Sequence, residues 1–232
     1  LAMMSMSCIT AAMVGIYTKM MPGEFIITAI PLNVVNALIV TNILHPVKIS
    51  EEEDTVARVN DGGQEREPFF SFLGNSILGA GRLILIICAN VIAFVALAKL
   101  IDMLLIIVHP ALTLENILGC IMFPFAWLMG LDTGEAFQLG QYMGTKLVTN
   151  EFVVMLNVQD VLGEFSRHMQ GVLTVFVTSF ANFSTLGMII GCFKGLVDDS
   201  KNELISRNVG YMLLSGILVS LLSAGIAGMF IW

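Results

Sequence analysis

Charged residues are scarce in this 232-residue chain and make up only 12% of it, about half their share in a typical soluble domain. Hydrophobic residues contribute 56%, and the mean hydropathy is +0.87. The shortage of charge excludes an ordinary water-soluble globular domain. We therefore predict an all-α integral membrane protein.

Paired cysteines and clustered histidines are also missing. The cysteines are far apart, each within an apolar segment: Cys8, Cys88, Cys120 and Cys192. This spacing excludes a zinc or redox motif, so we interpret them as small hydrophobic residues. The histidines are equally scattered: His45, His109 and His168. We expect no metal site formed by these residues.

The first segment of the chain is interpreted as neither a signal peptide nor an obvious natural start. The chain begins at Leu1 within an apolar segment that no basic region or cleavage site precedes. We therefore expect it to be the carboxy-terminal part of something longer. Much of the acidity behind the net charge of −7 falls in one loop: Glu51, Glu52, Glu53, Asp54, Asp61, Glu65 and Glu67. A charged loop says little about ligands, and we expect no nucleic-acid partner.

Apolar stretches of about 20 residues can cross the hydrocarbon core of a bilayer as helices. We predict transmembrane segments over about 3–21, 25–44, 83–108, 172–192 and 209–232. A polar linker covers 48–68, and 69–78 forms a surface helix with Phe69, Phe70, Phe72 and Leu73 facing the membrane. Residues 114–131 lie partly in the membrane. Lys99 and Asp102 are spaced to form an ion pair, which we interpret as structural and not functional. The distribution of Lys and Arg predicts that the linker lies in the cytoplasm.

Two polar clusters interrupt apolar stretches: Thr149-Asn150-Glu151 and the run 179–185. In lipid an unsatisfied polar group costs several kcal/mol, so these residues face a cavity, a partner or a ligand. Residues 134–148 are too short to cross the membrane and lead into 150–156, which predicts a re-entrant hairpin with a polar tip. A half-spanning hairpin followed by a broken helix is typical of secondary transporters.

The polar side chains suit a sugar-like ligand. Glu151 can accept hydrogen bonds from vicinal hydroxyls, Asn182 can donate and accept, and Thr185 adds a hydroxyl. Structural alternatives remain open. Glu151 could be neutralised by Lys146 or protonated because of burial. Asn182 and Thr185 could bond between helices, and Phe180 could serve in packing.

The first segment carries its own polar residues, Ser5, Ser7 and Thr10. They indicate either close helix packing with hydroxyls bonded to their own helix, or a second broken helix that binds a small cation. The sequence leaves both readings open.

These residues resemble a known family. Thr149-Asn150-Glu151-Phe152-Val153 and Ser179-Phe180-Ala181-Asn182-Phe183-Ser184 resemble the signature of the concentrative nucleoside transporters. The resemblance extends to Pro124, Gly130-Leu131-Asp132-Thr133-Gly134-Glu135-Ala136, Ser5-Met6-Ser7 and Gly15-Ile16-Tyr17. It is strongest to the carboxy-terminal portion of the bacterial nucleoside permeases. It implies a multi-pass homotrimer of the bacterial inner membrane, driven by a Na⁺ or H⁺ gradient and without an organic cofactor.

The implied fold is an inverted-repeat transporter, in which each repeat has a re-entrant hairpin followed by a broken transmembrane helix. Residues 1–44 then form the broken helix of the first repeat and the following transmembrane helix. Residues 45–82 form the charged linker and surface helix, and 83–131 a scaffold helix and interfacial segment. Residues 132–196 form the second hairpin and broken helix, and 197–232 the last transmembrane helix.

The resemblance also implies roles for particular residues. Substrate-binding roles fall on Glu151, Asn182, Thr185, Phe180 and Leu83: the first three bind ribose, Phe180 lines the site and Leu83 contacts the base. Ser7 and the carbonyl of Cys8 fall where a cation binds. The family's Gly-Gln-Ser/Thr-Glu tip, which reads the base, is absent, so base preference is not implied.

We therefore expect a nucleoside importer that works by cation symport and alternating access, and not an enzyme. One alternative is a membrane-embedded enzyme with Glu151 as a catalytic carboxylate, although no HExxH motif or paired catalytic histidine accompanies it. Another is a passive nucleoside channel, which the lack of charged rings disfavours.

Overall fold

The computed structural model describes residues 2–9, 11–46, 68–194 and 199–232, and within these ranges it contains helices and no strand. The prediction of an all-α fold is confirmed. The helices are α1 (Ala2–Ser5), α2 (Ala11–Tyr17), α3 (Gly23–Leu44), α4 (Phe69–Val108), α5 (Leu114–Leu128), α6 (Thr133–Val148), α7 (Glu151–Val158), the 3-10 helix η1 (Leu162–Glu164), α8 (Arg167–Val177), α9 (Phe183–Lys194), α10 (Asp199–Arg207) and α11 (Val209–Gly228). The predicted linker falls outside the described residues except for Pro68.

Polar residues at predicted boundaries begin several of these helices. Side-chain oxygens of Thr113, Asp132, Asn150 and Ser166 each accept a hydrogen bond from a backbone N–H in the first turn, at 3.2, 2.8, 3.0 and 3.1 Å respectively. Such caps satisfy N–H groups that have no partner within the helix. The turn from α5 to α6 uses Gly130 at φ +96°, which a glycine adopts without strain.

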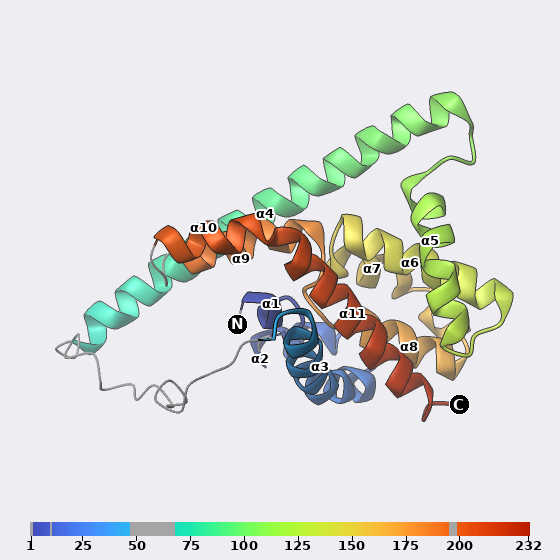
Figure 1. Cartoon of the computed structure of the whole chain (residues 1–232), viewed down its shortest axis with the longest axis horizontal. Helices are drawn as coiled ribbons and strands as arrows, with labels where there is room; N and C mark the ends of the chain where they lie inside the picture. The colour runs from blue at the N-terminus through green and yellow to red at the C-terminus, as the bar shows by residue number, and fades with distance from the viewer. Residues whose placement is uncertain (1, 10, 47–67, 195–198) are drawn as a thin grey trace.

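Helix α4 differs from the prediction. The expected surface helix 69–78 and the transmembrane segment 83–108 form one helix of 40 residues, which runs along one side of the molecule (Figure 1). No proline separates the two parts, and Gly79 and Gly81 between them weaken the helix without ending it. The predicted ion pair of Lys99 with Asp102 is not formed within the described residues. Asp102 Oδ1 instead accepts a hydrogen bond from the backbone N–H of Leu114 at 2.8 Å, at the start of α5.

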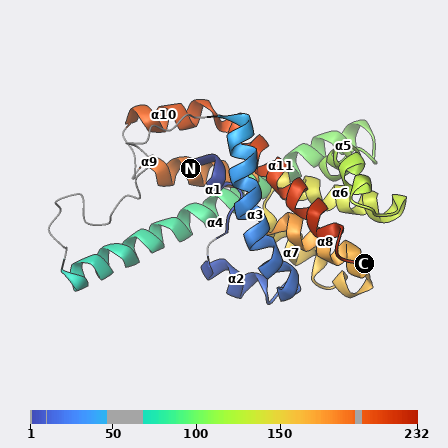
Figure 2. The ribbon, with the colours of Figure 1, turned by 60° about the horizontal axis from the view of Figure 1, so that its bottom comes forward.

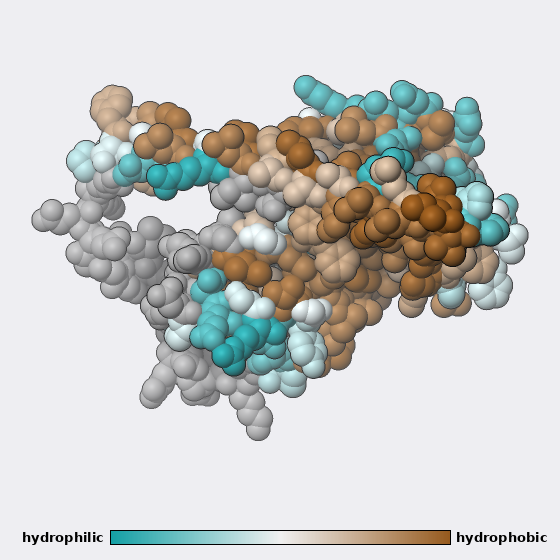
Figure 3. Space-filling model, turned by 90° about the horizontal axis from the view of Figure 1, so that it is seen from above, coloured by the Kyte–Doolittle hydropathy of each residue, from teal (hydrophilic) through white to brown (hydrophobic). Residues whose placement is uncertain are grey.

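Helices α3, α8 and α11 form the centre of the molecule, and α5 packs along α6 (Figures 1 and 2). Helices α3 and α11 are long and apolar enough to cross a membrane. Large apolar side chains on the outside stay exposed, among them Ile43 (72%) and Ile92 (70%). Hydrophobic residues cover much of the face shown in Figure 3. A surface of this kind is typical of contact with lipid or with a partner.

Both predicted breaks are present. Helices α1 and α2 are separated around residues 6–10, and α8 and α9 around 178–182. The structure thus favours the reading of the first segment as a broken helix, although Ser5 Oγ does bond to its own helix at Ala2 O (2.7 Å). Thr10 lies outside the described residues. The two breaks meet at Gly216 of α11, where an added Cβ would lie 2.7 Å from Ala181 Cβ and 3.1 Å from Met6 Cβ.

Candidate functional site

The carboxylate of Glu151 is the centre of the candidate site. Glu151 begins α7 at the tip of the hairpin and is only 4% exposed. Its Oε1 accepts a hydrogen bond from Tyr17 Oη, and its Oε2 accepts one from Asn182 Nδ2, both at 2.9 Å. A carboxylate has about four lone-pair positions. The bonds from Tyr17 and Asn182 use two of them, so the carboxylate retains capacity for a further hydrogen bond.

Two half-length helices begin at this carboxylate. Asn150 caps α7, because its Oδ1 accepts from the N–H of Val153. Asn182 stands immediately before α9, and its Oδ1 accepts from the N–H of Thr185 at 2.8 Å. Capping occupies the amide oxygen of Asn182 and leaves Nδ2 to reach Glu151. The positive ends of both helices therefore lie beside the carboxylate and favour oxygen-rich ligands there.

Asn182 is held by more than its own helix. In addition to the N–H of Thr185, its Oδ1 accepts hydrogen bonds from Ser184 Oγ at 2.7 Å and from Thr185 Oγ1 at 2.8 Å. The structure thus brings together Glu151, Asn182 and Thr185, as the sequence predicts. The hydroxyl of Thr185 is directed to Asn182, so in this structure it orients the amide.

Two apolar residues, Phe180 and Leu83, were also predicted to belong to the site. Phe180 lies in the break between α8 and α9 and is half-buried. Leu83 belongs to α4, but its side chain lies outside the described residues. Their roles toward a base remain predictions.

Tyr17 is a site residue that the sequence analysis missed. It is fully buried, and its ring lies edge-on to Phe152 with centroids 5.4 Å apart. The sequence analysis used Tyr17 only as part of the family resemblance. A phenol at the end of an apolar segment is the one signal that could have identified it, because a buried Tyr O–H usually finds a hydrogen-bond partner.

Lys146 is near enough to Glu151 for the two side chains to attract each other electrostatically. No ion pair joins the two within the described residues, and the Lys146 ammonium instead donates to the carbonyl oxygen of Phe176 at 2.7 Å and to Ser179 Oγ. The alternative that Lys146 neutralises Glu151 by direct contact is therefore not what the structure shows. Glu151 is satisfied by Tyr17 and Asn182.

The candidate cation residues lie at the first break. Ser7 is fully buried, and its Oγ has no hydrogen-bond partner among the residues that the structure describes. Cys8 is half-buried. A buried hydroxyl without a partner is costly, and a bound cation would satisfy it. The fit of Ser7 to a cation rests on this unpaired oxygen.

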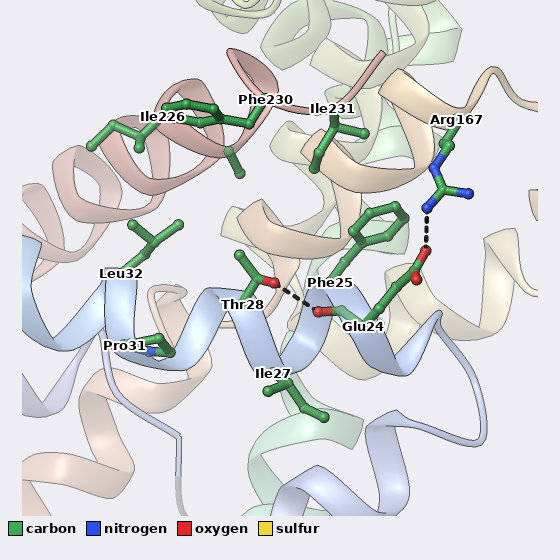
Figure 4. A pocket seen from close by; sticks show the side chains of 11 residues that line it. Glu24, Phe25, Ile27, Thr28, Pro31, Leu32, Arg167, Ile226, Phe230 and Ile231 are labelled. Atoms are coloured by element: carbon green, nitrogen blue, oxygen red, sulfur yellow. Dashed lines mark hydrogen bonds and ion pairs between the residues drawn. The ribbon is translucent and has the colours of Figure 1, made fainter.

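Two cavities lie away from Glu151 and Asn182. An open groove of about 710 Å³ lies between α3, α8 and α11, with the Arg167–Glu24 ion pair (3.0 Å) at its rim (Figure 4). A smaller cavity of about 230 Å³ lies between α4, α5 and the hairpin and includes Thr149. Neither is lined by Glu151 or Asn182, which are 4% and 0% exposed. The candidate site is therefore closed to solvent in this structure.

Several known proteins resemble this chain in sequence. Residues 25–228 match a family model described as "Na+ dependent nucleoside transporter C-terminus". The chain is 44% identical to the purine nucleoside transport protein NupG of Bacillus subtilis over 230 residues, covering 99% of this chain and 57% of that protein. It is 28% identical to the nucleoside permease NupC of Helicobacter pylori, covering 97% of this chain and 56% of that protein.

A solved structure shows the same fold. The chain matches CNTnw in an inward-facing substrate-bound state with a TM-score of 0.84 and 25% identity, covering 99% of this chain and 56% of that one. The chain thus spans somewhat more than half the length of these proteins.

Proposed function

Because this chain belongs to the concentrative nucleoside transporter family, we propose that the full-length protein imports nucleosides across the cell membrane by symport with Na⁺ or H⁺. One observation carries the proposal: a buried carboxylate, Glu151, lies where two half-helices begin and keeps lone pairs free for ribose hydroxyls. The related proteins are named as transport proteins, which favours transport over an enzyme or a channel.

The proposed binding mode follows from the donors and acceptors. Glu151 accepts hydrogen bonds from vicinal ribose hydroxyls, and the side-chain amide of Asn182 binds the same ribose. Phe180 lines the site, and Leu83 contacts the base. The coupling ion binds at Ser7 and the carbonyl of Cys8. Alternating access moves this closed site between the two sides of the membrane, with a coupling free energy between cation and nucleoside of about 1–3 kcal/mol.

The proposed setting is the bacterial inner membrane. Helices α3 and α11 cross the bilayer, α6 and α7 enter and leave on one side, and the whole protein assembles as a homotrimer.

The relative at 44% identity is named for purine nucleosides, so we propose purine nucleosides as the preferred substrates. Competition between adenosine and uridine for uptake tests this preference, and stronger competition by uridine would contradict it.

The function is tested by uptake into proteoliposomes that contain the full-length protein, under an imposed Na⁺ or H⁺ gradient. We expect accumulation of adenosine that depends on one gradient and is lost in Glu151→Gln, because the amide removes the charge that ribose hydroxyls bind. Glu164→Gln, at an exposed position in η1, is the control and should keep uptake. Accumulation by Glu151→Gln at the unaltered rate would refute the assigned site. Absence of uptake under both gradients from folded protein would refute the function.

A further inference from the structure

Lys146 is a fully buried lysine near the end of α6. The proposed nucleoside site does not use it. Its ammonium forms no direct ion pair with a carboxylate in the part of the chain described here, although Glu151 attracts it electrostatically. Burying an unpaired ammonium is expensive unless its surroundings replace water. The residues around it must therefore be arranged to hold a positive charge.

The groups around the ammonium are oxygen atoms and a ring face. The carbonyl oxygen of Phe176 accepts a hydrogen bond at 2.7 Å, and the ring of the same residue has its centroid 4.6 Å from Nζ. Ser179 Oγ and, at 3.5 Å, Ser220 Oγ complete the contacts. The two hydroxyl oxygens are themselves 2.7 Å apart. Carbonyl and hydroxyl oxygens with an aromatic face form a suitable set for a monovalent cation.

The position of these groups explains why a cation is favourable. Phe176 is in the last turn of α8, and Ser179 is in the break that follows. The last carbonyls of a helix lack partners and carry partial negative charge, so a cation at this end is stabilising. Ends of broken helices commonly coordinate cations in transporters for the same reason. Here the protein supplies the cation itself.

We propose that the break between α8 and α9 contains a built-in monovalent cation site, filled by the ammonium of Lys146, which positions Asn182 for the nucleoside. The proposal rests on the proposed function. The hairpin holds the break at both ends: Lys146 binds Ser179 at its start, and Glu151 binds Asn182 at its end. Lys146 is thus a positioning residue that acts through the break.

The first break provides a contrast. There the buried hydroxyl of Ser7 has no partner, and no lysine ammonium contacts it among the described residues. One break therefore has a tethered cation, and the other has a free oxygen that a mobile cation can bind. This difference supports the proposed assignment of the exchangeable ion to the first break.

The test is equilibrium binding of adenosine to the purified full-length protein in detergent, where no gradient exists. Lys146→Met keeps the length of the side chain without its charge, and Lys146→Ala leaves room for a small amine. We expect both to raise the Kd for adenosine by about tenfold or more. Methylammonium should restore binding in Lys146→Ala but not in Lys146→Met, and choline, which is too large, should restore neither. Lys19→Ala, at an exposed lysine, should bind as the unaltered protein does.

A second readout needs no nucleoside. Methylammonium should raise the melting temperature of Lys146→Ala and leave that of Lys146→Met unchanged. Unaltered adenosine binding by Lys146→Met would refute the proposal, as would a folded Lys146→Ala that methylammonium affects in neither assay.

If the Lys146 variants do not fold, Ser179→Ala and Ser220→Ala replace them. A raised Kd for adenosine in these variants supports the site, and an unchanged Kd refutes it. Absence of binding of both adenosine and uridine by the unaltered protein would instead refute the proposed function, while the melting temperatures still test the cation site.

Discussion

The phenol of Tyr17 donates a hydrogen bond of 2.9 Å to Glu151 Oε1, although the two residues are 134 positions apart. This bond joins the end of the first broken segment to the tip of the hairpin. Asn182 binds the other carboxylate oxygen from the second broken segment. Glu151 is therefore oriented by both broken segments together, and a movement of either segment changes the site.

Tyr17→Phe tests this relationship by removing only the hydroxyl. A hydrogen bond to a charged group contributes about 1.5–3 kcal/mol, so we expect the Kd for a nucleoside to rise about tenfold. Tyr211→Phe, at a residue that is 57% exposed, is the control and should leave the Kd unchanged. Binding of nucleosides by Tyr17→Phe with the unaltered Kd would show that the phenol does not orient the carboxylate.

The sequence predicted the local elements of this site because their signals are local. Asn150 and Asn182 interrupt apolar stretches, and each caps the half-helix that follows it. Glu151 is conspicuous because a carboxylate is expensive in an apolar segment. These features identify a hairpin tip and a helix break without knowledge of their partners.

The partners could not be predicted, because they depend on how distant helices pack. Tyr17 contacts Glu151 only once the first broken segment folds against the hairpin. Lys146 was considered as a partner for Glu151, but helix geometry directs it toward the end of α8. Helix α4 was predicted as two segments, but no proline lies between them to end the helix, and the glycines there only weaken it.

Asn182 has two functions that substitutions can separate. Asn182→Ser and Asn182→Asp both keep a side chain that can cap α9, but neither offers the amide N–H that reaches Glu151. Asp also places a second carboxylate beside the first. We expect nucleoside binding to fall in both variants and to fall further in Asn182→Asp, while the melting temperature of Asn182→Ser stays near that of the unaltered protein. Equal nucleoside Kd values for Asn182→Asp and the unaltered protein would contradict the assigned contact.

Ser7 should affect the coupling ion and not the nucleoside directly. In the described part of the chain its buried hydroxyl has no hydrogen-bond partner, so Ser7→Ala removes a ligand of the proposed cation without breaking a bond seen there. We expect the cation concentration for half-maximal uptake to rise about tenfold, with uptake at saturating cation largely retained. Ser5→Ala is the control, because the Ser5 hydroxyl is bonded to its own helix at Ala2 O. An equal cation requirement in Ser7→Ala and the unaltered protein would exclude Ser7 as a ligand.

Gly216 permits the two breaks to approach α11. Gly225, further along the same helix, gives a matched comparison. In Gly216→Ala the added Cβ would lie 2.7 Å from Ala181 Cβ, so a backbone must shift, which costs about 1–3 kcal/mol of unfolding free energy.

Gly225 lies on the same helix, but an added Cβ there meets nothing within 4 Å. Gly225→Ala should therefore stabilise the protein by about 0.5–1 kcal/mol, because alanine is the better helix former. Thermal unfolding of the two variants should then shift the melting temperature in opposite directions. Because Ala181 immediately precedes Asn182, Gly216→Ala should also weaken nucleoside binding, which Gly225→Ala should not. A shift in the same direction for both variants would mean that α11 and the two breaks do not pack as closely as the structure shows.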